Sequence, residues 1–279
     1  MSRHEQYASN AGFHLVNADA PEILVLLHGL GADHKQPLDA IAGVDTGGFA
    51  VLAPDVRAHG GSSVIGERAD FAFDALVQDL LALVGRLGQA HKPAHIVGIS
   101  MGAAIGLRTA LSRDFTVRSL TLIRPAFTDV PLPGNLVAMR EIGELLGAGG
   151  DTSATRAQFA ASRRYRDIAA ISQMGGDSLL GQFDAPLAVE RSIRLRSVPR
   201  NRAYCSAEEL ASISVPTVVV GTKNDPVHPY SLAQRWSRLI PGARFETVPP
   251  RDRDPLATAN RVRECVGAHL ASVRATSWT

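Results

Sequence analysis

Short, unbroken apolar runs separated by longer segments of helical periodicity constrain the fold of this chain more than any other feature. The runs lack the alternation of a half-exposed strand, which is typical of strands covered on both faces. Segments between them, such as Phe73–Leu87, carry apolar residues three and four positions apart. This alternation predicts an α/β fold, with helices on both faces of a mostly parallel sheet. The main runs are Glu22–Leu27, Phe49–Ala53, His95–Ile99 and Thr217–Val220.

The strand pattern is interrupted once. After Ser119–Ile123, the sequence shows helical segments but no clear strand until Thr217. We therefore expect an α/β core made of residues 1–125 and 213–279, with residues 126–212 inserted as a helical lid. The predicted lid helices are Leu136–Leu146, Thr155–Met174 and Ala185–Arg196.

Composition excludes several classes of partner. The net charge of +2 is too small to indicate nucleic acid or a membrane as partner. The N-terminal segment has no signal-peptide pattern, and no run reaches the ~18 apolar residues of a membrane span, so a cytoplasmic protein is expected. The spacing of Cys205 and Cys265 indicates no metal site, and we expect no cofactor. Assembly as a homodimer is left open.

The pentapeptide Gly98-Ile99-Ser100-Met101-Gly102 is the strongest chemical signal. It follows a predicted strand and opens a predicted helix, which is the context of a nucleophile elbow. The serine would lie in a tight turn, and its neighbours two positions away must be small so that strand and helix can pass closely. Its hydroxyl would then project from the C-terminal edge of the sheet, near a helix N-terminus that favours a developing anion.

With His28–Gly31 after the first buried strand, this pentapeptide resembles the α/β-hydrolase fold superfamily. The resemblance implies an esterase-like serine hydrolase with Ser100 as nucleophile. It also implies an oxyanion hole formed by the N–H groups of Leu30 and Met101, in which one donor is typically worth about 3–4 kcal/mol. His28 is a candidate substrate-binding residue, although a structural role is favoured over proton transfer.

The rest of a catalytic triad follows the family pattern only in part. The family places its acid in a G-x-x-D-x-x-x-P loop, which matches Asp225 after the Thr217–Val220 strand. Its histidine normally follows the last strand, but residues 249–255 contain none. Three explanations stay open: His228 is the base, another group serves, or the site has lost its ordinary base. The other groups considered are His28, His34, Asp252, Asp254 and a group of the substrate.

Arginines are concentrated in the predicted lid. The segment from Arg156 to Arg202 contains nine arginines and four acidic residues. A solvated helix face is favoured over recognition of a substrate carboxylate by these guanidinium groups. Arg124 is the better anion-binding candidate, because it ends a strand at the C-terminal edge where ligands bind in open α/β sheets.

The motifs specify the fold better than the substrate, because this fold hosts many chemistries. We expect a serine hydrolase acting on an ester or related carbonyl group of a small molecule. Two alternatives remain: a catalytically degenerate protein that binds a small molecule, and a lyase or transferase that uses the same pocket.

Overall fold

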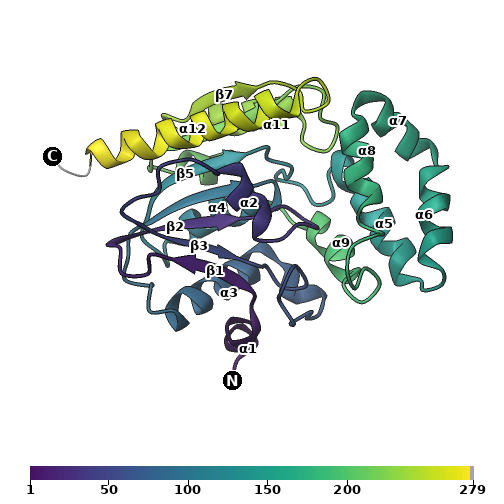
Figure 1. Cartoon of the computed structure of the whole chain (residues 1–279), viewed down its shortest axis with the longest axis horizontal. Helices are drawn as coiled ribbons and strands as arrows, with labels where there is room; N and C mark the ends of the chain where they lie inside the picture. The colour runs from purple at the N-terminus through teal and green to yellow at the C-terminus, as the bar shows by residue number, and fades with distance from the viewer. Residues whose placement is uncertain (277–279) are drawn as a thin grey trace.

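A seven-stranded sheet forms the centre of the molecule in the computed structural model, which describes residues 1–276 (Figure 1). The strand order is β1-β3-β2-β4-β5-β6-β7, and only β1 runs antiparallel to its neighbour. The predicted α/β fold is therefore confirmed. The strands are β1 (Phe13–Val16), β2 (Glu22–Leu27), β3 (Phe49–Pro54), β4 (Ala94–Ile99), β5 (Val117–Ile123), β6 (Thr217–Thr222) and β7 (Arg244–Val248).

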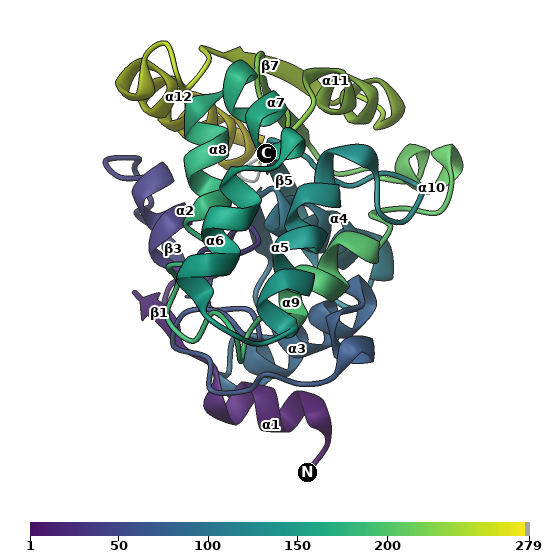
Figure 2. The same cartoon turned by 90° about the vertical axis from the view of Figure 1, so that its right-hand side faces the viewer.

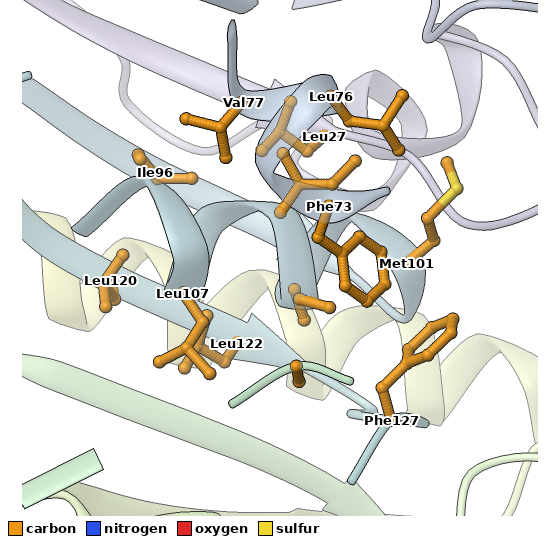
Figure 3. Packing of buried hydrophobic residues seen from close by; sticks show 14 of the residues in the cluster. Leu27, Phe73, Leu76, Val77, Ile96, Met101, Leu107, Leu120, Leu122 and Phe127 are labelled. Atoms are coloured by element: carbon orange, nitrogen blue, oxygen red, sulfur yellow. The ribbon is translucent and has the colours of Figure 1, made fainter. Parts of the chain in front are cut away.

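Helices pack on both faces of the sheet, and the alternation of side chains along each strand supplies both layers. On β2, Val25 and Leu27 point into one apolar core, whereas Leu24 and Leu26 point into the other. Figure 3 shows the first core, where Leu27 packs near residues of α3. Helices α3 (Phe73–Arg86), α4 (Met101–Ser112) and α11 (Tyr230–Leu239) cover that face, and α2 (Lys35–Ala40) and α12 (Pro255–Thr276) cover the opposite face.

A helical insertion, residues 124–216, separates β5 from β6, and its residues 137–180 lie beyond one end of the sheet (Figures 1 and 2). It has an apolar core of its own, in which Ile142, Leu179 and Leu195 are fully buried. Its role as a lid stays a prediction. The helices are η2 (Gly134–Leu136), α5 (Val137–Gly147), α6 (Thr152–Ala160), α7 (Arg163–Ile171), α8 (Gln173–Leu180), α9 (Ile193–Ser197), η3 (Val198–Arg200) and α10 (Ala207–Ala211).

The insertion differs from the sequence-based prediction in its helix boundaries. The single helix predicted over Thr155–Met174 is three helices, because two serines stop and restart it. Ser162 accepts a hydrogen bond from the N–H of Tyr165, and Ser172 accepts one from the N–H of Gly175. Such caps compete with helix continuation. The helix predicted over Ala185–Arg196 is mostly turns, and only α9 is regular.

Arg191 and Arg194 are buried, which corrects the expected solvated face for these two arginines of the insertion, whereas the clustered Arg163, Arg164 and Arg166 are exposed as expected. Arg191 donates to the carbonyl oxygens of Gly60 and Ser62 at 2.9 and 3.0 Å, and Arg194 donates to that of Ala58. These bonds join the insertion to the loop after β3. The N-terminal segment adds α1 (Arg3–Asn10), and η1 (Arg68–Phe71) precedes α3. No helix within residues 1–276 combines the length and apolarity needed to cross a membrane.

Candidate active site

Ser100 lies in the turn that joins β4 to α4, with φ at 54° in the left-handed region that non-glycine residues seldom adopt. Its N–H donates to the carbonyl of Ile123 at 2.9 Å, which ties the turn to the end of β5. A Cβ on Gly98 would lie 2.3 Å from the carbonyl oxygen of Gly102, and one on Gly102 would lie 2.1 Å from that of Leu27. Only glycine fits at these positions, so the expected close passage of strand and helix is confirmed.

The serine hydroxyl begins a chain of hydrogen bonds. Oγ of Ser100 lies 2.9 Å from Nε2 of His228, and Nδ1 of His228 lies 2.9 Å from Oδ2 of Asp225. The acid and the imidazole come from one loop after β6, three residues apart. The structure therefore brings together Ser100, Asp225 and His228, and the position after β7 that lacks a histidine is not needed to complete the set.

The electrostatics of Asp225 define how the imidazole is oriented. Its Oδ1 accepts hydrogen bonds from the N–H groups of Val227 and His228. Burial alone would raise the pKa of this carboxyl, but His228 and then Arg124 hold the pKa below its ordinary value. An ionised carboxylate can only accept, so Nδ1 of His228 donates to Asp225, and in a neutral ring Nε2 then accepts from the serine hydroxyl. This arrangement can remove the hydroxyl proton as a nucleophilic attack begins.

The two expected oxyanion-hole residues lie on either side of Ser100. Leu30 follows Gly29 in the turn after β2. This turn passes close to the serine, because a Cβ added to Gly29 would lie 3.6 Å from Cβ of Ser100. Met101 is the first residue of α4. Among residues 1–276, neither the N–H of Leu30 nor that of Met101 donates a hydrogen bond to another protein group. Their role as an oxyanion hole stays a prediction.

A cavity that opens to solvent is lined in part by Ser100. The serine itself is 8% exposed. Apolar side chains from the core and the insertion supply much of the wall, and charged groups gather near β6 and the loop after β7. The apolar residues are Leu30, Ile99, Phe127, Leu136, Met139, Leu179 and Val227, and the charged ones are Arg124, Lys223, Asp225, Arg251 and Asp252.

His28 does not reach this cavity, which corrects its expected place among the substrate-binding residues. The ring is fully buried, its Nε2 accepts from the N–H of Val56 at 3.0 Å, and its Nδ1 lies 2.8 Å from the carbonyl of Gly29. Burial, more than any other influence, lowers the pKa of His28, so the ring is neutral and both nitrogens are engaged. It holds the turn that carries Leu30.

The other groups considered as bases have different partners. Nδ1 of His34 lies 3.0 Å from Asp55, whose carboxylate also accepts from Gly61. Asp254 caps the start of α12 by accepting from Ala257. No cluster of His, Cys, Asp or Glu within the described part of the chain, residues 1–276, is suited to hold a metal ion.

Arg124 lines the cavity beside Ser100, Asp225 and His228. Its side chain is 14% exposed, and its Nη1 lies 3.7 Å from Oδ2 of Asp225. Burial, and next Arg251, lower the pKa of Arg124 to about 10, so the guanidinium stays charged at neutral pH.

Sequence reasoning missed two groups that connect the insertion to this site. The amide of Asn135 donates to the carbonyls of Ala126 and Val227 at 2.9 and 2.8 Å, and so fixes the loop between Asp225 and His228. Asp252, considered only as a base, accepts from the Ser172 hydroxyl and the Met174 N–H. Neither contact leaves a sequence signal, because each joins segments about 80 or more residues apart.

Comparison with known proteins agrees with this architecture. Residues 24–264 match the family model described as alpha/beta hydrolase family. The chain is 27% identical to rhodomycin D methylesterase of Streptomyces peucetius, over 87% of this chain and 90% of that protein. It is 25% identical to pyrrolizixenacetamide deacetylase of Xenorhabdus hominickii, with 80% of each chain covered. A meta-cleavage product hydrolase from Pseudomonas fluorescens shares the fold, with 19% identity, a TM-score of 0.70 and 94% of each chain covered. The chain belongs to the alpha/beta hydrolase family.

Proposed function

We propose that this protein is a serine hydrolase that cleaves an ester or related carbonyl bond of a small molecule. One observation carries the proposal: the continuous hydrogen-bond chain from Oγ of Ser100 through His228 to Asp225, with both distances at 2.9 Å. Without such a base, a serine hydroxyl is a poor nucleophile near neutral pH. The names of two relatives, a methylesterase and a deacetylase, are consistent with acyl transfer to water.

The reaction proceeds in two halves. Oγ of Ser100 attacks the substrate carbonyl while Nε2 of His228 takes its proton, and the resulting oxyanion accepts hydrogen bonds from the N–H groups of Leu30 and Met101. The imidazolium, stabilised by Asp225, protonates the leaving group, and an acyl-serine remains. Water then attacks this ester with His228 again as base, which releases the acid and restores the serine.

The alternative of a degenerate binding protein was favoured by the absence of a histidine after the last strand. His228 lies within hydrogen-bond distance of Ser100, so no observation favours the alternative. Identifying the reaction products distinguishes hydrolysis from a lyase or transferase reaction. Turnover in water enriched in ¹⁸O incorporates the label into the acid product only if water is the acceptor.

Labelling with a fluorophosphonate probe and turnover of 4-nitrophenyl butyrate test the proposal together. Ser100→Ala abolishes labelling and lowers kcat by at least about 10⁴-fold, and His228→Gln has a comparable effect. Ser112→Ala, at the far end of α4, is the control for serine, and His34→Gln is the control for histidine. Labelling and turnover that survive Ser100→Ala contradict the proposal.

A further inference from the structure

Arg124 occupies the edge of the sheet one residue beyond β5. Its N–H donates to the carbonyl of Val220 on β6 at 2.8 Å, and its φ is 49°. A non-glycine residue held in the left-handed region requires support from its surroundings and is found preferentially at functional sites. This backbone position directs the guanidinium into the cavity that also contains the hydroxyl of Ser100.

The guanidinium of Arg124 forms an ion pair with Asp225 but no hydrogen bond with it. Its Nη1 is buried and makes no hydrogen bond within residues 1–276. The neighbouring Oδ2 of Asp225, at 3.7 Å, is too distant for a hydrogen bond and is already engaged by His228. The other oxygen of Asp225 accepts from two backbone amides. A buried polar donor in this condition is costly unless a ligand completes it.

The charged side chains that line the cavity, with Arg124 included, sum to one positive charge. Three cationic side chains line it against two carboxylates, namely Arg124, Lys223 and Arg251 against Asp225 and Asp252. Asp252 is held by Ser172 and Met174 of the insertion. Within residues 1–276, Arg251 forms no ion pair with a carboxylate. The excess of one positive charge matches a monoanion better than the dianion of a phosphate monoester.

We propose that the substrate carries a carboxylate, which Arg124 binds, with Arg251 adding to the positive potential, while the carbonyl to be attacked lies at Ser100. The assignment rests on the proposed hydrolase function and narrows its substrate class. A planar guanidinium fork suits a carboxylate, and hydrogen bonds between charged partners are about twice as strong as neutral ones. The apolar wall formed by Phe127, Met139 and Leu179 accommodates the remainder of the molecule.

A purely structural role for Arg124, as a companion to the carboxylate of Asp225, makes a different prediction. In that case, substitution of Arg124 would lower kcat/KM by the same factor for every substrate, because Ser100, His228 and Asp225 transfer the proton in each reaction. Loss of anion recognition changes the ratio between a charged and a neutral substrate. The ratio of two kcat/KM values is therefore the informative measurement.

Two chromogenic esters of equal acyl length supply this ratio: the mono-4-nitrophenyl ester of glutaric acid, which carries a carboxylate, and 4-nitrophenyl pentanoate, which does not. We expect the unsubstituted protein to favour the charged ester at least about tenfold, and Arg124→Gln to reduce the preference by about 10- to 100-fold. Arg118→Gln is the matched control, because Arg118 is exposed at the opposite end of β5 and leaves the preference intact.

An unchanged preference in Arg124→Gln, with turnover that still depends on Ser100, overturns the carboxylate proposal and leaves the hydrolase proposal in place. Titration of monomethyl glutarate into the Ser100→Ala protein provides a readout without turnover. We expect its Kd to increase about tenfold or more when Arg124→Gln is added, while dimethyl glutarate shows no comparable change. Equal Kd values for monomethyl glutarate overturn the proposal, whatever becomes of the hydrolase assignment.

Discussion

The central sheet and the helical insertion are held in place by different interactions. The sheet is fixed by continuous apolar layers on both faces, which involve residues from nearly every strand. The insertion shares some of that packing through Leu136 and Tyr204. Several of its other attachments are buried or half-buried hydrogen bonds made by Asn135, Arg191 and Arg194. Apolar burial is distributed and non-directional, whereas a hydrogen bond depends on a few atoms. We therefore expect the insertion to be perturbed by single polar substitutions that leave the sheet intact.

The largest effect is expected where the sheet meets the elbow. Gly102→Ala places a Cβ 2.1 Å from the carbonyl oxygen of Leu27, so β2 or α4 must move, and we expect a loss of about 3 kcal/mol or more in the free energy of unfolding. Gly85→Ala in α3 is the control: its Cβ meets no atom within 4 Å, and helix propensity should stabilise the protein by about 0.5–1 kcal/mol. Urea denaturation measures both. Equal stability of the two variants would contradict the close strand–helix contact.

Acid should lower the free energy of unfolding through His269, a residue of α12, which packs on the sheet. Burial above all lowers the pKa of this ring to about 4 from an ordinary value of 6.5. The unfolded chain therefore binds the proton more readily, and stability is lost as the pH falls from about 6.5 to about 4, by about 3 kcal/mol from this residue. Denaturation measured across this pH range gives the free energy of unfolding as a function of pH. This dependence should be shallower in His269→Gln than in the unsubstituted protein. His91→Gln, at an exposed position, should keep the original slope, and an identical slope in His269→Gln would refute the assignment.

A smaller effect, confined to the insertion, is expected from Arg194→Met. The substitution leaves the carbonyl of Ala58 without its charged donor, and we expect a cost of about 2 kcal/mol. Hydrogen exchange should accelerate across the helices of the insertion and not across β2 and β4. Arg196→Met, two residues along the same helix but exposed, is the control. Faster exchange throughout the molecule would show that sheet and insertion behave as one unit.

The smallest expected effect concerns the place where the insertion touches the candidate site. Asn135→Ala frees the carbonyl of Val227 and loosens the loop that carries His228, so kcat should fall about fivefold while KM changes little, at a stability cost of about 1 kcal/mol. Asn201 also bridges two backbone carbonyls, those of Phe71 and Val198, away from the candidate site. Asn201→Ala should cost similar stability without lowering kcat. Equal kcat in the two variants would remove Asn135 from the positioning of the site.

The sequence predicted most of the sheet and the elbow because both depend on local composition. A continuous apolar run such as Glu22–Leu27 is typical of a strand covered on both faces. The insertion was predicted less accurately, since its helix breaks at Ser162 and Ser172 depend on side-chain caps that periodicity does not reveal. The burial of Arg194 depends on carbonyl groups of a loop more than a hundred residues away.

By itself, the sequence determined the α/β architecture and the position of the serine, because apolar periodicity and the glycines of the elbow act over a few residues. It also indicated Asp225, yet it left three explanations for the base. Only the tertiary structure brought Nε2 of His228 within 2.9 Å of the serine hydroxyl, placed His28 away from the cavity, and left a donor of Arg124 without a partner. These outcomes depend on contacts between segments that are far apart in the sequence. The distances between their side chains are fixed only when the sheet edge and the insertion pack together.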